Sequence, residues 1–154
     1  MKKTLARYPA LFARFMSLWP PFLGAGIRVD HIAPDWREVR SSLKLNFFNR
    51  NYVGTHFGGS LFAMTDPFLM LMLANLLGRN YWVWDQAAEI RFLRPGKGRV
   101  QAVFRVSDAD LEEIRTACAE GRKYLKEYLV AITDETGETV ASVSKVIYVR
   151  SRRR

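Results

Sequence analysis

The feature that most constrains this chain is a long apolar stretch, residues 51–78, which contains a single charged side chain, Asp66. Arg50 and Arg79 are the nearest charges on either side. A lone carboxylate is costly to bury among apolar residues unless another group neutralises or uses it. Asp66 is therefore the first candidate for chemistry. The structural alternative is an exposed aspartate at the point where Pro67 breaks a helix.

The same stretch predicts one apolar helix over residues 58–77. Gly58 and Gly59 open it, and Gly78 is a typical C-cap. A helix that is apolar nearly all round is predicted to be wrapped by other elements. Pro67 disfavours helical geometry at the residue before it, so we expect a kink near Asp66. The apolar run is short and interrupted for a membrane span, which favours a helix wrapped by strands.

Alternating apolar residues predict strands at 26–34, 38–45, 81–92, 99–106, 124–133 and 138–150. An amphipathic helix within residues 1–19, stopped by Pro20 and Pro21, precedes them, and a short helix at about 108–120 separates the fourth and fifth. This order predicts an α+β fold in which a curved antiparallel sheet surrounds one long central helix. We expect an N-terminal helical extension (1–25), a main domain (26–150) and a basic tail (151–154).

The formal net charge of +9 comes from the two ends of the chain. Residues 1–28 and 145–154 hold ten basic and no acidic residues, whereas the residues between hold 14 basic and 15 acidic ones. This distribution argues against nucleic-acid binding as the main function. Cys118 is the single cysteine, which excludes an internal disulfide and fits a reducing, cytoplasmic location. With two histidines in all, a zinc site of several Cys and His ligands is not expected.

The start of the central helix suggests chemistry. The backbone N–H groups of Gly58 and Gly59 are unobstructed by side chains and favour negative charge, as on the oxygen of an attacked ester or thioester carbonyl. Asp66 follows Gly59 by seven residues, about two helical turns, which puts both on nearly the same face. Its carboxylate would activate water or attack directly, with Asn51 holding the water or carbonyl. Alternatively, the glycine pair only permits tight packing.

The segment N-Y-V-G-T-H-F-G-G, followed after six residues by Asp, resembles the signature of hotdog-fold thioesterases. In their phenylacetyl-type branch the loop is Asn-x-x-Gly-x-x-His-Gly-Gly, with a catalytic Asp or Glu on the central helix. The matching positions are Asn51, Gly54, Gly58, Gly59 and Asp66. The resemblance covers about residues 26–150 and is strongest to a bacterial branch with an N-terminal helix. One departure is Phe57 at the usual histidine position, with His56 one place earlier.

The resemblance implies a hotdog fold and an acyl-thioester hydrolase that acts on acyl-CoA or acyl carrier protein. It implies that the Gly58 N–H polarises the thioester carbonyl and that Asp66 is base or nucleophile, with Asn51 as helper. It further implies a homodimer or a dimer of dimers whose sites form across the interface, so that Asn51 and Asp66 come from different subunits. Coenzyme A enters as part of the substrate, and no cofactor or metal is expected.

Further residues are candidates for substrate binding. Asp85 falls near the position where some relatives place a helper Ser or Thr, and a carboxylate there would raise the pKa of Asp66 if the two are close. Basic residues around the Pro95 turn would meet the coenzyme A phosphates or form an ordinary solvated turn: Arg91, Arg94, Lys97 and Arg99. Phe57 is counted with the substrate-binding residues.

Two other functions fit the same residues. The first is a hotdog dehydratase or isomerase that uses His56 and Asp66 as acid and base, which requires both side chains to reach one substrate. The second is a non-catalytic acyl-binding or membrane-surface protein. Its membrane version depends on the amphipathic N-terminal helix and the basic ends, which suit a peripheral contact with anionic lipid.

Overall fold

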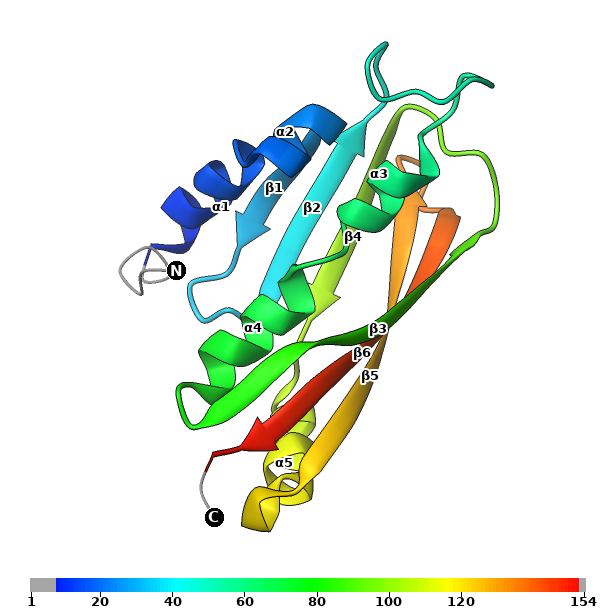
Figure 1. Ribbon diagram of the computed structural model, residues 1–154. Helices are drawn as coiled ribbons and strands as arrows, with labels where there is room; N and C mark the ends of the chain where they lie inside the picture. The colour runs from blue at the N-terminus through cyan, green and yellow to red at the C-terminus, as the bar shows by residue number, and fades with distance from the viewer. Residues whose placement is uncertain (1–7, 153–154) are drawn as a thin grey trace.

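The computed structural model describes residues 8–152, and its elements follow the predicted order (Figure 1). The strands are β1 (Ile27–Ile32), β2 (Glu38–Lys44), β3 (Tyr81–Phe92), β4 (Arg99–Arg105), β5 (Lys123–Asp134) and β6 (Thr139–Ser151). The helices are α1 (Pro9–Ser17), α2 (Pro20–Ala25), α3 (Gly58–Ala63), α4 (Phe68–Leu77) and α5 (Asp108–Ala117), with a 3-10 turn at Ala119–Gly121. Each predicted strand is therefore present at its expected place in the chain.

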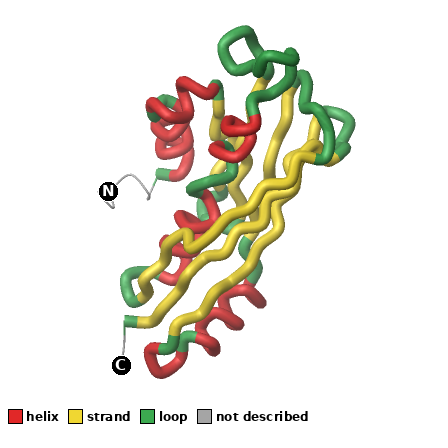
Figure 2. The backbone as a smooth tube through the Cα atoms, turned by 45° about the vertical axis from the view of Figure 1, so that its right-hand side comes forward, coloured by secondary structure: helices red, strands yellow, loops and turns green. Residues whose placement is uncertain are grey.

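The strands form one six-stranded antiparallel sheet in the order β1-β2-β4-β5-β6-β3. The neighbours β1 and β2, and likewise β5 and β6, pair directly as hairpins. Asp134 holds the second turn, because its Oδ1 accepts hydrogen bonds from the amides of Thr136 (2.9 Å) and Glu138 (3.1 Å). The sheet is strongly twisted, and the central helical segment lies against its concave side (Figures 1 and 2). The expected α+β fold, a curved sheet around a central helix, is confirmed.

The central helix consists of two pieces. The first piece, α3, ends at Ala63, and α4 begins at Phe68, so Asp66 lies in the break between them. The kink expected before Pro67 is thus confirmed. The long central helix expected over residues 58–77 is present, and the kink divides it. The two-turn count from Gly59 to Asp66 applies to a regular helix, which this break interrupts. The physical reason is Pro67, which has no N–H to donate and disfavours helical geometry at Asp66.

Distant side chains satisfy the carbonyl groups that the break leaves without helical partners. Ser41 on β2 donates its hydroxyl to the carbonyl oxygen of Met64 at 2.9 Å. Lys145 on β6 donates from Nζ to the carbonyl oxygen of Asp66 at 2.8 Å. The carbonyl of Ala63 is not free either, since it accepts from the amide of Asp66 at 3.2 Å. A buried polar group left unpaired costs about 1–3 kcal/mol, so these contacts stabilise the broken shape.

The second piece of the central helix supplies much of the core. Residues 58–77 are long and apolar enough to cross a membrane by length and composition alone, but 50% of this segment is buried inside the fold, as a core helix would be. The buried side chains of α4 are Phe68, Leu69, Met72, Leu73 and Leu77. These side chains pack into the same core cluster as the inward residues of the strands, so this face of the helix is wrapped as predicted.

The N-terminal helices cover the β1 edge of the sheet. On α1, Phe12, Ala13 and Met16 are buried. Ser17 accepts a hydrogen bond from the amide of Val29 at 2.9 Å, which ties α1 to β1. Pro20 and Pro21 were expected only to stop a helix, whereas they begin α2. Proline suits the first helical position because its missing N–H would have no partner there.

Candidate active site

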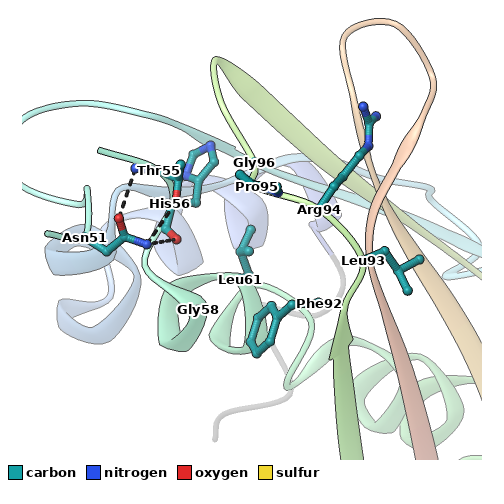
Figure 3. Close-up of a pocket in the computed structure, with 10 residues that line it drawn as sticks. All are labelled: Asn51, Thr55, His56, Gly58, Leu61, Phe92, Leu93, Arg94, Pro95 and Gly96. Carbon is teal, nitrogen blue, oxygen red and sulfur yellow. Dashed lines mark hydrogen bonds between the residues drawn. The ribbon is translucent and has the colours of Figure 1, made fainter. Parts of the chain in front are cut away.

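The signature loop borders a cavity of about 490 Å³ (Figure 3). One wall comes from the loop and the start of α3, and the other from the end of β3 and the turn that follows it. The lining residues are Asn51, Thr55, His56, Gly58, Leu61, Phe92, Leu93, Arg94, Pro95 and Gly96. Three of the predicted catalytic residues, Asn51, His56 and Gly58, are therefore brought to one cavity, and Asp66 is not among its lining residues.

Asn51 orders the loop with its side chain. Its Nδ2 donates to Thr55 Oγ1 at 2.9 Å and to the carbonyl oxygen of His56 at 3.2 Å. Its Oδ1 accepts from the amides of Val53 (3.1 Å) and Thr55 (3.0 Å). The polar atoms of this amide are thus committed to the loop in this chain, and the result is a fixed path for the backbone that leads to Gly58.

The first two amides of α3 are available to a ligand. The amides of Ser60 and Leu61 already donate to the carbonyl of Phe57. Neither Gly58 N–H nor Gly59 N–H donates a hydrogen bond to any residue that the structure describes. Both positions also have little room for a side chain, because an added Cβ would lie 2.8 Å from Phe92 Cζ at Gly58 and 2.4 Å from Phe57 Cε1 at Gly59. The glycine pair thus supplies two backbone donors without acceptors among the described residues, and Gly58 borders the cavity.

His56 is buried beside the turn after β3. Its Nε2 lies 3.2 Å from the carbonyl oxygen of Gly98, which can only accept, so Nε2 carries the proton. Its Nδ1 is buried and has no hydrogen-bond partner among residues 8–152. Burial lowers the pKa of His56, and the bond to Gly98 opposes that shift. Phe57, at the family's histidine position, is instead 57% exposed and packs against the Gly59 backbone.

Asp66 belongs to a second cluster, which is centred on a fully buried lysine. Lys145 Nζ lies 2.7 Å from Asp85 Oδ1 on β3 and 3.5 Å from Asp66 Oδ1. The lysine side chain is 0% exposed, whereas the side chain of Asp66 is 64% exposed. The carboxylate of Asp66 is therefore exposed to solvent, while Lys145 contacts its backbone carbonyl oxygen and one carboxylate oxygen from the buried side. The lone carboxylate of the apolar stretch is thus accessible to solvent, with a buried ammonium group 3.5 Å from one of its oxygens.

Asp85 takes part in this cluster as a partner of the lysine. A bulge in β3 between Asp85 and Ala87 shifts the pairing with β6 so that Ala88 lies opposite Lys145. Burial raises the pKa of Asp85, Lys145 acts against that shift, and the negative charge of Asp66 adds a smaller upward contribution. A shared ammonium group lies between the two carboxylates, 2.7 Å from Asp85 and 3.5 Å from Asp66.

Lys145 was not among the residues selected from the sequence. A signal was present, because Lys145 occupies the inward register of β6 with Val143, Ile147 and Val149, all of which are buried. A lysine in the buried register of a strand is rare unless it is paired. Its partners lie on other elements, however, and strand alternation alone does not name them.

The basic residues near Pro95 have acidic partners of their own. Arg91 pairs with Glu89 at 2.9 Å, and Arg99 pairs with Asp30 at 2.9 Å. Arg94 donates to Asp134 at 2.8 Å and to the carbonyl of Thr139 at 3.1 Å, and it also pairs with Glu138. Lys97 is exposed and forms no salt bridge within residues 8–152. Arg94, which lines the cavity, therefore connects the cavity wall to the β5–β6 hairpin through these contacts.

The two clusters are separate within one chain. His56 contacts the turn after β3, and Asp66 contacts Lys145 of β6. No hydrogen bond joins His56 to Asp66 among the described residues. The hypothesis of a dehydratase or isomerase that uses these two as acid and base therefore has no contact in its favour within this chain.

The arrangement matches known structures. A probable thioesterase from Pseudomonas aeruginosa, PA5026, is 23% identical with a TM-score of 0.76, and the match covers 98% of this chain and 97% of that one. The thioesterase HI1161 from Haemophilus influenzae is 13% identical with a TM-score of 0.66, over 100% and 95% of the two chains. A mutant of the phenylacetic acid degradation protein PaaI from Thermus thermophilus is 22% identical with a TM-score of 0.57, over 84% and 97%.

These similarities show the fold: the chain has the hotdog fold that its signature predicts. The family follows from the sequence itself. The model described as "Domain of unknown function (DUF4442)" matches residues 9–149, and the chain belongs to this family. A search of the curated proteins found no match.

Proposed function

We propose that this protein hydrolyses acyl thioesters of coenzyme A or acyl carrier protein. The observation that carries the proposal is the pair of unpaired amides, Gly58 N–H and Gly59 N–H, at the start of a helix whose first residue lines a cavity of about 490 Å³. Backbone donors held in place are well suited to stabilise the oxyanion formed when a thioester carbonyl is attacked. Because α3 has only six residues, these two N–H groups rather than a long helix dipole would carry the effect.

In this proposal the thioester carbonyl oxygen accepts a hydrogen bond from Gly58 N–H. Asp66 takes a proton from a water molecule whose oxygen bonds to the acyl carbon. Alternatively, its carboxylate attacks that carbon directly, and water then cleaves the resulting acyl–aspartyl anhydride to release the acid and regenerate Asp66. The tetrahedral intermediate then breaks the C–S bond, and the thiolate leaves and takes up a proton. Lys145 acts as a positioning residue, since it fixes the Asp66 backbone at 2.8 Å and contacts Oδ1 at 3.5 Å.

We further propose that the working form is a homodimer or a dimer of dimers. Asp66 does not line the cavity of its own chain, so a carboxylate from a second copy would complete the site. The sheet supports this arrangement, because β3 is an edge strand that exposes Trp84 (45%) and Phe92 (57%). An unpaired, apolar edge strand is a template for pairing with another chain.

The test is a panel of acyl-CoA substrates with short, long and aromatic acyl groups, together with an acyl carrier protein thioester, assayed for release of free thiol. We expect catalytic turnover of at least one of them at micromolar enzyme. Saturable binding of acyl-CoA without thiol release from any substrate would contradict hydrolysis and would support the non-catalytic acyl-binding alternative.

A further inference from the structure

We propose that the outer face of α1 and α2 docks on the surface of an anionic lipid bilayer. This face consists of Leu11, Phe15 and Leu18 of α1 and its C-cap, continued by Trp19 and Leu23. The inference does not depend on the proposed hydrolysis, because it concerns a different surface and its test uses no thioester.

The apolar residues on this face of α1 are largely exposed. Leu11 is 53% exposed, Phe15 52% and Leu18 67%. Their spacing of four and three residues places them on one side of α1. The opposite side of the helix is apolar as well, and its residues Phe12, Ala13 and Met16 already cover the core. A helix at the surface of a globular protein normally turns polar residues outward, so the second apolar side of α1 needs another explanation.

The face continues beyond α1. Trp19, the N-cap residue of α2, is 42% exposed, and Leu23 in α2 is 60% exposed. Tyr8, directly before α1, is 61% exposed. Tryptophan and tyrosine combine an apolar ring with a polar tip and are enriched where protein meets the lipid headgroups. The surface therefore has the composition of an interfacial helix.

The charge of Arg14 and of the N-terminal sequence points to an anionic partner. Arg14 is exposed within the stripe, between Leu11 and Phe15. Every charged residue in the first 28 positions is basic: Lys2, Lys3, Arg7, Arg14 and Arg28. Basic residues beside an apolar stripe are the combination that attracts an amphipathic helix to anionic lipid.

The residues next to this face leave its positive charge unopposed. Leu11 and Arg14 also line a cavity of about 710 Å³ between α1 and β1. Asp30 is the acid in that lining, and Arg99 pairs with it at 2.9 Å. The acid is thus neutralised, and the positive charge of Arg14 is left without an acidic partner among the described residues.

A second copy of this chain is the competing occupant, and the charges disfavour it. A two-fold symmetric contact brings the same patch of both subunits together. Such a contact through this face would bring the unpaired Arg14 of one subunit close to the same residue of the other. The edge strand β3, at the opposite end of the sheet order from β1, is also available for pairing between copies.

The test measures co-sedimentation of the full chain with phosphatidylcholine vesicles that contain or lack about 30% phosphatidylglycerol. We expect binding to the anionic vesicles that weakens with added salt, and at least tenfold weaker binding to phosphatidylcholine alone. The triple variant Leu11→Ser, Phe15→Ser, Leu18→Ser should bind at least tenfold more weakly. The variant Leu129→Ser, which changes an apolar side chain that is 77% exposed on β5, is the matched control and should bind as the wild type does.

A second pair of variants tests the charge and guards against misfolding of the triple variant. Arg14→Glu should weaken anionic vesicle binding at least threefold, whereas Arg115→Glu, on the exposed side of α5, should not. Wild-type protein that fails to bind anionic vesicles would overturn the proposal. So would variants of Leu11, Phe15 and Leu18 that change the oligomeric state in solution and leave vesicle binding intact.

Discussion

The cavity at Gly58 and the cluster around Lys145 are built by different means. The cavity depends on local backbone: Asn51 orders the loop, and Gly58, whose amide has no acceptor among the described residues, lines the cavity. The Lys145 cluster depends on charge brought together from three elements, the helix break, β3 and β6. Damage to the glycine start of α3 should therefore reduce activity and leave the fold intact, whereas loss of the buried lysine should destabilise the fold.

The largest expected effect is that of Lys145→Met. It removes the counter-charge of Asp85 and the donor to the Asp66 carbonyl from a site with 0% exposure of the lysine. Removal of one partner from a buried ion pair costs about 3–5 kcal/mol, and we expect the free energy of unfolding to fall by about 3 kcal/mol in urea denaturation.

The control for this variant is Lys123→Met, at an exposed position at the start of β5. It should change the free energy of unfolding by less than about 0.5 kcal/mol. A Lys145→Met protein as stable as this control would show that the buried lysine does not hold the helix break.

Gly58→Ala should reduce activity and leave the stability of the fold nearly unchanged. The added methyl group would lie 2.8 Å from Phe92 Cζ, and Phe92 is exposed enough to move away into the cavity. We expect kcat/KM for thiol release to fall about tenfold through misplacement of the substrate, with little change in melting temperature.

Two matched variants sharpen this prediction. Gly24→Ala, where no atom lies within 4 Å of the added Cβ, should leave kcat/KM unchanged. The double variant Gly58→Ala, Phe92→Ala relieves the close contact and should recover part of the loss. If the single variant unfolds the protein, or if Phe92→Ala restores nothing, the steric explanation fails.

The smallest expected effect is the pH dependence contributed by His56. Burial lowers its pKa in the folded protein, so the unfolded chain binds the proton more readily. Stability contributed by the neutral ring is present above pH about 6.5, the ordinary histidine value, and is lost as the pH falls below it.

We therefore expect the wild type to lose stability between pH 7 and pH 5 relative to His56→Gln. The slope of that difference cannot exceed about 1.4 kcal/mol per pH unit, the limit for one proton. Denaturant titrations of both proteins across this range provide the measurement. If the stability of the two proteins changes in parallel with pH, then His56 has the same pKa in the folded and unfolded states.

Local signals in the sequence identified the cavity side of the site. The glycine pair marks the start of α3, and Pro67 predicts the break that leaves Asp66 outside both helical pieces. Turn residues such as Asp134 and the cap Ser107 gave the ends of their elements, because each interaction spans a few residues.

The Lys145 cluster could not be derived in the same way. Lys145 and Asp66 are 79 residues apart, and their contact depends on the bulge and the register between β3 and β6. The same limit applies to Arg94, whose acidic partners Asp134 and Glu138 lie about 40 residues further along the chain. The partners of a side chain across a sheet depend on the register between strands. The alternation of apolar and polar residues along one strand does not determine that register.

The most direct test of the account is the rate of thiol release by Asp66→Asn with the best acyl-thioester substrate. The substitution keeps the backbone carbonyl that accepts from Lys145 at 2.8 Å, so the melting temperature should stay close to that of the wild type. Loss of a base or nucleophile should lower kcat by about 10²–10⁴-fold, whereas Glu127→Gln, an exposed carboxylate on β5, should have no effect. A folded Asp66→Asn protein with a wild-type kcat would contradict the account.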